Sequence, residues 1–239
     1  MSSSLTTLVR RGVIRTAVAQ RPCPSLFLYP GLTSRAFWPL SSLPPDLTAS
    51  ISAICSARED VLAEYDRLAA AAPAGDYSLL EKEHTLNDGG TWTWHTAIAK
   101  GTLRADFAIA APQTMGLLAN VPGLLLGGIP FAYAFFSSMR AGARIAPHFG
   151  PTNTRLRVHV PLRVPQARGA ALTVAGEARA WKLGEPLVFD DAFEHAAVNE
   201  TSEARVVLLF DVWHPELSLD ERAALEHMFN SARKEGWLA

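Results

Sequence analysis

Two histidines in this chain, His148 and His195, occupy positions from which both could bind one metal ion. His148 ends an expected strand that contains residues 145–147, and His195 follows an expected strand at 187–189 and a short turn. Imidazole nitrogens on adjoining strands of a barrel can chelate iron, zinc, copper or nickel. A histidine pair alone is also compatible with packed or surface side chains, which is how we interpret His84, His95, His214 and His227.

Arginines close to these histidines in the sequence indicate which kind of ligand could bind beside a metal ion at this site. Alternation in residues 154–160 places Arg155, Arg157 and His159 on one face of a strand. Arg205 begins a strand that is apolar on both faces, so its guanidinium needs an anionic partner. A metal beside a buried guanidinium suits a small dicarboxylate such as 2-oxoglutarate, which would chelate the ion at one end and pair with arginine at the other.

The expected elements form a mainly β double-stranded β-helix, a cupin-like jelly roll with flanking α-helices. Short segments rich in β-branched or aromatic residues predict the strands: 91–99, 131–139, 154–162, 170–175, 186–190 and 204–212. Helical spacing predicts one helix from Leu47 to Ala72, ending before Pro73. A second helix is predicted after Ser218, which forms a capping-box pattern with Glu221. We interpret Trp38 and Trp181 as packing residues.

Composition limits the partners and divides the chain into two parts. The 239 residues carry a net charge of −1, so we expect no nucleic-acid partner but a peptide, protein or small-molecule substrate. Residues 1–21 contain basic but no acidic residues and predict a transit peptide or a disordered arm, with residues 22–239 as the folded domain. A transit peptide would direct the protein to a mitochondrion or plastid, whereas an arm would be compatible with the cytoplasm.

Residues 117–139 lie within the longest uncharged stretch, 107–139, and reach the length of a membrane span. Pro122, Gly123 and Pro130 interrupt it, so it predicts a buried turn followed by a strand, and we expect no transmembrane segment. The two cysteines, Cys23 and Cys55, have neither the number nor the spacing of a disulfide framework or a zinc site.

Four blocks of sequence resemble the aspartyl/asparaginyl β-hydroxylases. The sharpest are residues 148–159 (HFGPTNTRLRVH) and 189–195 (FDDAFEH), and the resemblance extends from residues 28–32 (LYPGL) to residues 212–217 (VWHPEL). It implies an Fe(II)- and 2-oxoglutarate-dependent dioxygenase that uses dioxygen and hydroxylates an unactivated carbon, with the β-carbon of Asp or Asn in a peptide as the candidate target. We expect neither the tetratricopeptide region nor the membrane anchor that animal members use, so free amino acids and modified lipids are further candidate substrates.

The resemblance also assigns residues to the site. It implies iron ligands at His148 and His195, with a catalytic role for Arg205 as well. It implies contacts to 2-oxoglutarate from four residues: Ser137, Arg157, His159 and Arg205. Trp94 matches a further contact, for which the neighbouring Trp92 competes. Without the resemblance, Ser137 would be an ordinary strand hydroxyl and Arg157 a solvated cation.

A glycine, Gly150, stands where related oxygenases have an Asp or Glu iron ligand. The resembled family shares this lack, and two neutral imidazoles with a dianionic cosubstrate would leave the Fe(II) complex neutral. Our hypothesis is that Asp191 holds water at the vacant position; the alternative is a turn-forming Asp. Two other functions remain open: a cupin-like metalloprotein that does not use 2-oxoglutarate, and a non-catalytic binding module.

Overall fold

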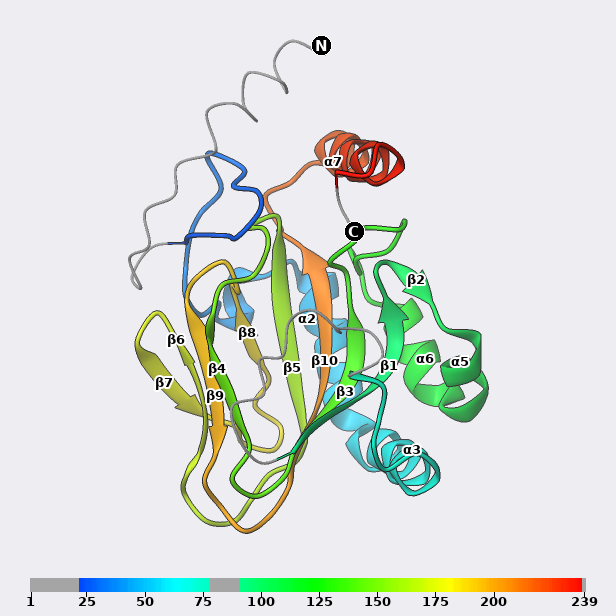
Figure 1. The fold of residues 1–239 in the computed structure, drawn as a ribbon, viewed down its shortest axis with the longest axis vertical. Coiled ribbons are helices and arrows are strands. Elements are labelled where there is room, and N and C mark those ends of the chain that lie inside the picture. Colours follow the sequence, from blue (N-terminus) through cyan, green and yellow to red (C-terminus); the bar gives the residue numbers. More distant parts are fainter. Residues whose placement is uncertain (1–21, 78–90, 238–239) are drawn as a thin grey trace.

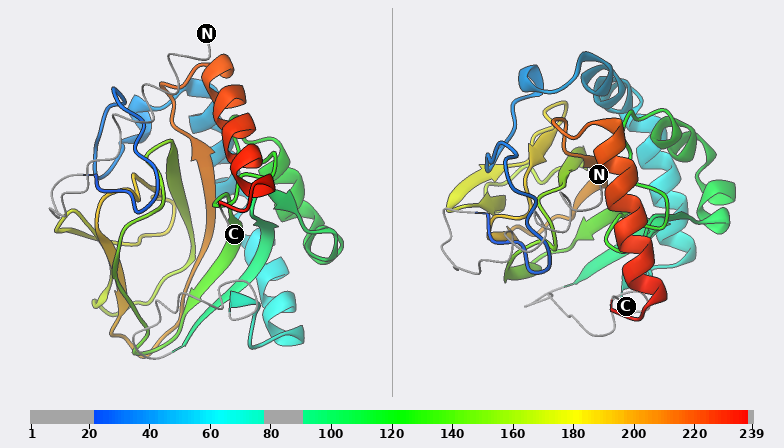
Figure 2. Two further views of the ribbon diagram at one scale, coloured as in Figure 1. Left: turned by 45° about the horizontal axis from the view of Figure 1, so that its top comes forward. Right: turned by 90° about the horizontal axis from the view of Figure 1, so that it is seen from above.

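The computed structural model describes residues 22–77 and 91–237. The predicted transit peptide or arm at residues 1–21 and the surface position predicted for His84 lie outside this part of the chain. The described strands form two antiparallel sheets that face each other (Figures 1 and 2). This arrangement confirms the predicted mainly β, cupin-like jelly roll with flanking helices.

The larger sheet has six strands and the smaller has four. In spatial order the larger contains β2 (Thr102–Leu103), β1 (Trp92–Ala99), β3 (Ala134–Met139), β10 (Arg205–Trp213), β5 (Arg155–Arg163) and β8 (Leu187–Phe189). The smaller contains β4 (Arg144–His148), β9 (His195–Asn199), β6 (Ala170–Val174) and β7 (Glu177–Ala180). The long central strands β5 and β10 lie side by side, so residues far apart in the sequence share one inner surface.

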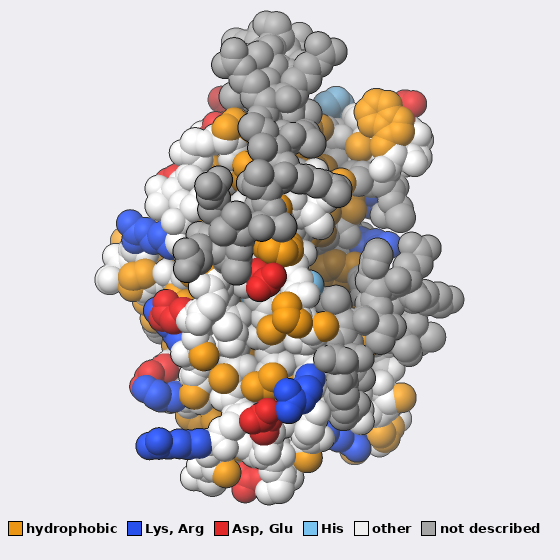
Figure 3. Space-filling model, turned by 60° about the vertical axis from the view of Figure 1, so that its left-hand side comes forward, with side chains coloured by type: hydrophobic (Ala, Val, Ile, Leu, Met, Phe, Trp, Pro, Cys, Tyr) orange, Lys and Arg blue, Asp and Glu red, His pale blue; other side chains and the backbone are white. Residues whose placement is uncertain are grey.

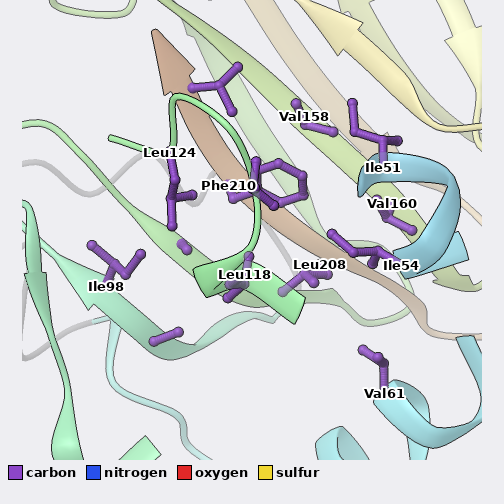
Figure 4. Packing of buried hydrophobic residues seen from close by; sticks show 14 of the residues in the cluster. Ile51, Ile54, Val61, Ile98, Leu118, Leu124, Val158, Val160, Leu208 and Phe210 are labelled. Atoms are coloured by element: carbon purple, nitrogen blue, oxygen red, sulfur yellow. The ribbon is translucent and has the colours of Figure 1, made fainter. Parts of the chain in front are cut away.

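Helices cover the outer face of the six-stranded sheet (Figure 2). They are η1 (Leu40–Ser42), α2 (Pro45–Ser56), α3 (Arg58–Ala71), α5 (Ala105–Ala110) and α6 (Pro112–Ala119). Ile51 and Leu118 from the helices pack against Val158 and Phe210 from the strands in a fully buried cluster (Figure 4). Burial of this apolar face fixes the helices against the sheet, whose other face is turned toward the four-stranded sheet.

The predicted single helix from Leu47 to Ala72 is wrong in one respect, because the chain bends at Ala57 and forms two helices. The bend allows Ile54 of α2 and Val61 of α3 both to be fully buried in the same core (Figure 4). Packing therefore overrides a sequence that contains no proline or glycine at this point. The predicted end is confirmed, since Ala72 caps α3 before Pro73.

The C-terminal helix α7 (Leu219–Lys234) begins as predicted. Ser218 and Glu221 form a reciprocal capping box, in which each side chain accepts a hydrogen bond from the other residue's backbone N–H. None of the described helices is long and apolar enough to cross a membrane. On the face shown in Figure 3, basic and acidic side chains of the described residues lie intermixed.

The two faces of β5 have the predicted difference in character. Leu156, Val158 and Val160 are fully buried in the core beneath the helices. Arg155, Arg157 and His159 alternate with them and face the space between the two sheets, where they line a pocket. A single strand thus supports the hydrophobic core on one side and positions polar groups on the other.

Candidate active site

A pocket of about 450 Å³ lies between the two sheets. Every residue that the sequence suggested for the site lines it: Trp94, Ser137, His148, Arg157, His159, His195 and Arg205. Most of these side chains are buried, so charge inside the pocket acts in an environment of low dielectric constant. The tertiary fold therefore gathers residues from β1, β3, β4, β5, β9 and β10 around one cavity.

His148 and His195 face each other directly across neighbouring strands. They are register partners in the β4–β9 pair, and their ring centroids lie 4.0 Å apart. The Nδ1 of His148 donates to the carbonyl of Ala146 at 2.8 Å, and the Nδ1 of His195 donates to that of Phe193 at 3.0 Å. Because a carbonyl can only accept, both protons sit on Nδ1, and both Nε2 lone pairs are available to a metal.

Burial keeps these two imidazoles neutral. It lowers the pKa of His148, and burial together with the neighbouring His148 lowers the pKa of His195 to about 3. Neutral imidazole is the form that binds metal ions. The pair is therefore in the protonation state and the tautomer that a shared metal ion requires.

Arg205 is a buried cation without an acidic partner among the described residues. Its side chain is 1% exposed, and its Nη1 donates to the carbonyl and the hydroxyl of Ser137 at 2.9 and 3.1 Å. The guanidinium lies over the ring of Trp181, 4.4 Å from its centroid, and its Nε has no hydrogen-bond partner in the described structure. Burial lowers the pKa of Arg205 to about 9. A guanidinium held in this way provides a site for an anion.

His159 adds a second unused donor. The indole of Trp181 donates to its Nδ1 at 3.2 Å, and an indole nitrogen cannot accept. Burial, then the positive charge of Arg205, lower the pKa of His159 well below its ordinary value, so the ring is neutral with its proton on Nε2. That Nε2 is buried and has no partner within the described residues. Trp181, which the sequence suggested only for packing, therefore also sets the tautomer of His159.

The two candidate tryptophans differ in what their indoles bind. Trp92 donates to the hydroxyl of Ser137 at 2.9 Å. Trp94 stacks on Phe135, with centroids 4.0 Å apart, and its buried indole N–H has no partner in the described part of the chain. Trp94 is thus the one with a donor left for a ligand, which favours it over Trp92 for the predicted contact.

Arg157 lines the pocket but is held by acids of the protein itself. Asp211 accepts from its Nε at 2.8 Å and its Nη2 at 3.0 Å, and Asp191 lies 3.6 Å from its Nη1. Arg155 bridges the same two carboxylates. Although burial alone would raise the pKa of Asp191, Arg155 and Arg157 hold it well below the ordinary value. Both acids are thus partners of arginines, and they fix the two guanidinium groups.

The fully buried carboxylate of Asp191 also explains the glycine beside the histidines. A Cβ added at Gly150 would lie 2.5 Å from that carboxylate, and the Gly150 N–H donates to the Asp191 carbonyl at 2.6 Å. The turn contact expected for an Asp here belongs instead to Asp190, whose side chain accepts from the Ala192 N–H. A carboxylate ligand at position 150 would collide with Asp191.

The residues present fit an Fe(II) ion with a dicarboxylate cosubstrate. No group of three or more His, Cys, Asp or Glu side chains able to hold a metal occurs within residues 22–77 and 91–237, so the histidine pair would leave positions for other ligands. Three buried donors without partners, on Trp94, His159 and Arg205, line the same cavity. A buried donor left unpaired is costly, and a bound carboxylate would satisfy it.

Two other histidines have the structural roles expected of them. His95 hydrogen-bonds the carbonyl of Ala72 at 2.9 Å and packs edge-on against Tyr65. His214 hydrogen-bonds the carbonyl of Thr33 at 3.1 Å. The sequence interpretation did not assign Asp211, which no local pattern marks because its partners lie on another strand.

The fold and the pocket define a jelly-roll protein with a two-histidine pair that faces a buried guanidinium. Residues 56–215 match the family model of aspartyl/asparaginyl beta-hydroxylase, and the chain belongs to this family. The resemblance noted in the sequence is thereby confirmed.

Curated relatives carry the same family name. The chain is 36% identical over 149 residues to the aspartyl/asparaginyl beta-hydroxylase of Homo sapiens, which covers 61% of this chain and 19% of that protein. It is 40% identical over 102 residues to aspartate beta-hydroxylase domain-containing protein 1 of Mus musculus, and the match covers 41% of this chain and 28% of that protein. The chain thus matches less than a third of the length of either relative. A cupin domain of Schizosaccharomyces pombe Cnp3 overlaps 40% of this chain and 63% of its own, at 15% identity and a TM-score of 0.31.

Proposed function

We propose that this protein is an Fe(II)- and 2-oxoglutarate-dependent dioxygenase that hydroxylates the β-carbon of an Asp or Asn residue in a peptide. The observation that carries the proposal is the neutral pair His148 and His195, opposite a buried Arg205 that has no acidic partner among the described residues. The family to which the chain belongs, and the names of its relatives, support the hydroxylation of Asp or Asn.

The two binding functions divide between the two sheets. His148 and His195 would hold the iron from β4 and β9 of the smaller sheet. Arg205 and Ser137 would hold the far carboxylate of 2-oxoglutarate from β10 and β3 of the larger sheet, with the Nε2 proton of His159 as a further donor. Arg157, fixed by Asp211, presents positive charge without rotating away.

When bound, the iron and 2-oxoglutarate supply the oxidising power to insert one oxygen atom of O₂ into a C–H bond, with release of succinate and CO₂. The protein prepares the site around them. Carbonyls fix the metal-binding tautomers, and the aromatic wall that includes Trp94 and Phe135 excludes water. Asp191, held by Arg155, would accept a hydrogen bond from water beside the histidines, as we hypothesised.

Metal analysis and product assays test this proposal. Protein purified without oxygen should bind about one Fe(II) per chain and release succinate from 2-oxoglutarate, and a peptide containing Asp should gain 16 Da. His195→Ala should lower iron affinity and succinate release at least about 100-fold, whereas His95→Gln, on the far side of the sheet, should retain both. An active His195→Ala enzyme, or iron binding without any use of 2-oxoglutarate, would contradict the proposal and favour the cupin-like alternative.

A further inference from the structure

Lys100 lies at the outer end of the pocket. It lines the same cavity as Arg205 and His159 but is only half-buried, whereas those two are 1% and 5% exposed. Leu26, 44% exposed, and the exposed Ser25 line the cavity as well. The cavity thus runs from a buried end, where the cosubstrate would bind, to a partly exposed end that carries a lysine.

Lys100 is a cation that the proposed chemistry does not use. Four cations line the pocket: Lys100, Arg155, Arg157 and Arg205. Arg155 and Arg157 form ion pairs with Asp191 and Asp211, and Arg205 would receive the cosubstrate. Lys100 has no ion pair among the described residues. Within the described residues, one positive charge at the entrance is therefore left for the carboxylate of another molecule.

The backbone at Lys100 gives a second, independent reason to assign this side chain a role. Lys100 and Gly101 form the two-residue turn between β1 and β2, flanked by the register pair Ala99 and Thr102, with φ values of 49° and 72°. Such a turn requires positive φ at both residues and favours Asn or Asp before the Gly. Lysine is strained there, and residues held in rare conformations are found preferentially at functional positions.

We propose that Lys100 binds a carboxylate of the substrate outside the residue that is hydroxylated, and so selects acidic segments. This inference rests on the proposed function and adds a determinant of specificity to it. The carboxylate could belong to a flanking Glu or Asp side chain or to the C-terminus of a peptide. Because the lysine is partly exposed, the interaction should weaken as salt is added.

The chain offers a matched pair of variants for the test. Among the described residues, Lys100 and Ala175 are the non-glycine residues with positive φ, and Ala175 precedes Gly176 in the β6–β7 turn, away from the pocket lining. Lys100→Asn should relieve backbone strain and raise the melting temperature by about 1–4 °C. Ala175→Asn should relieve the same strain with a smaller rise, because the half-buried Ala175 packs against the apolar cluster between the sheets. Both variants should therefore fold, and a loss of selectivity confined to Lys100→Asn reports the charge alone.

Selectivity can be read from a pool of amidated nine-residue peptides with a central Asp, alanine elsewhere, and Glu, Gln or Lys at one flanking position. We expect the wild-type protein to hydroxylate Glu members about 3-fold to 10-fold faster than Gln members at low salt. Lys100→Asn should reduce that ratio to about one, Lys100→Glu should favour Lys members, and Ala175→Asn should match the wild type. The same peptides with free C-termini distinguish a terminal carboxylate from a side chain.

Each outcome bears on a separate claim. Equal rates for Glu and Gln members, together with equal rates for peptides with free and amidated ends, would overturn the role of Lys100 and leave the proposed function intact. Succinate release without hydroxylation of any member would overturn the Asp-peptide substrate together with the role of Lys100. Absence of succinate release would overturn the proposed function itself.

Discussion

Arg205 shows the conflict between stability and binding most directly. A guanidinium that is 1% exposed, with no acid beside it in the described structure, loses its hydration without receiving an ion pair in return. Its folded pKa of about 9 lies below the ordinary value, so the charged form is penalised at every pH below 9 and the penalty disappears only above about 12. At neutral pH the buried, charged guanidinium therefore lowers the stability of the folded protein.

Replacing Arg205 with Met should make the fold more stable and the binding of 2-oxoglutarate weaker. We expect Arg205→Met to raise the melting temperature of the ligand-free protein by about 2–4 °C, roughly 1 kcal/mol. The affinity for 2-oxoglutarate should fall at least about 100-fold, because one of the two ends of the cosubstrate loses its partner. Differential scanning fluorimetry and calorimetric titration measure the two effects. A variant that is less stable yet binds normally would show that the guanidinium serves the fold and not the ligand.

Asp190 and Asp191 are adjacent, buried carboxyls with opposite pKa shifts. Burial raises the pKa of Asp190 well above the ordinary value, whereas Arg155 and Arg157 lower that of Asp191 despite its burial. An acid with a lowered folded pKa contributes stability above its unfolded pKa near 4, and this contribution is lost as the pH falls. The two acids should therefore respond differently to the same substitution.

Asp191→Asn should cost about 3 kcal/mol of unfolding free energy at pH 7, because Arg155 loses a buried charged partner. The difference from wild type should shrink as the pH falls from 5 to 3, because the Asp191 carboxyl takes up a proton in the unfolded wild-type chain while it is still charged in the folded protein. Asp190→Asn keeps the oxygen that accepts from Ala192 and should cost much less at pH 7. Denaturant unfolding at several pH values checks this, and a constant cost of Asp191→Asn down to pH 3 would argue against a charged Asp191.

At the scale of elements, the loop after β4 and the turn before β9 fit against each other through Gly150. Its φ needs no glycine, but a Cβ there would meet the Asp191 carboxylate at 2.5 Å. Glycine is therefore required at position 150 because the loop after β4 contacts the turn before β9. Sequence preferences for turns do not predict such a contact. The contact also leaves no room for a carboxylate side chain at position 150 itself.

Replacing two different glycines with alanine should change the free energy of unfolding in opposite directions. Gly150→Ala should lower the unfolding free energy by about 1–3 kcal/mol, because Asp191 must move within its ion-pair network. Gly116 lies inside α6 with open space around its Cβ position, so Gly116→Ala should raise stability by about 1 kcal/mol. Chemical denaturation compares them. Tolerance of Ala at position 150 without loss would mean that Asp191 is not fixed in place.

Some elements were predictable and others were not, for physical reasons. The alternation in β5 and the capping box of α7 are local patterns, and both appear as expected. The break at Ala57 has no local cause and follows from packing against the sheet. Strand β7 is exposed throughout and forms because it pairs with β6, while α5 and α6 are short helices supported by the core.

In the whole molecule, one ligand complex would connect two sheets. His148 and His195 belong to the four-stranded sheet, and Arg205 and Ser137 to the six-stranded one. A cosubstrate bound to the metal and to the guanidinium at once would bridge them, so each ligand should strengthen the binding of the other. The stabilisation of the fold by the metal and the cosubstrate together should then exceed the sum of the stabilisation by each ligand alone.

Thermal shifts with Mn(II), a stand-in for Fe(II) that does not turn over in air, test this coupling. At about 100 times their dissociation constants, each ligand should contribute about 2.7 kcal/mol, and Mn(II) with 2-oxoglutarate together should raise the melting temperature more than the sum of either alone. Arg205→Met should keep the Mn(II) shift and lose the increment from 2-oxoglutarate, while His195→Ala should lose both. Strict additivity in the wild type would indicate separate sites.

Local sequence patterns were enough to predict the class of fold, the face of β5 that carries polar groups and the residue types around a potential metal, because alternation along a strand and a lone charge in an apolar run can be read from neighbouring residues. Which polar groups have a partner follows only from the packing of the two sheets. Arg157 donates to Asp211, and the indole of Trp181 fixes the proton of His159 on Nε2. Arg205 has no acid beside it within the described residues. Those outcomes depend on hydrogen-bond geometry between strands that are distant in sequence, and such contacts exist only after the two sheets have packed together.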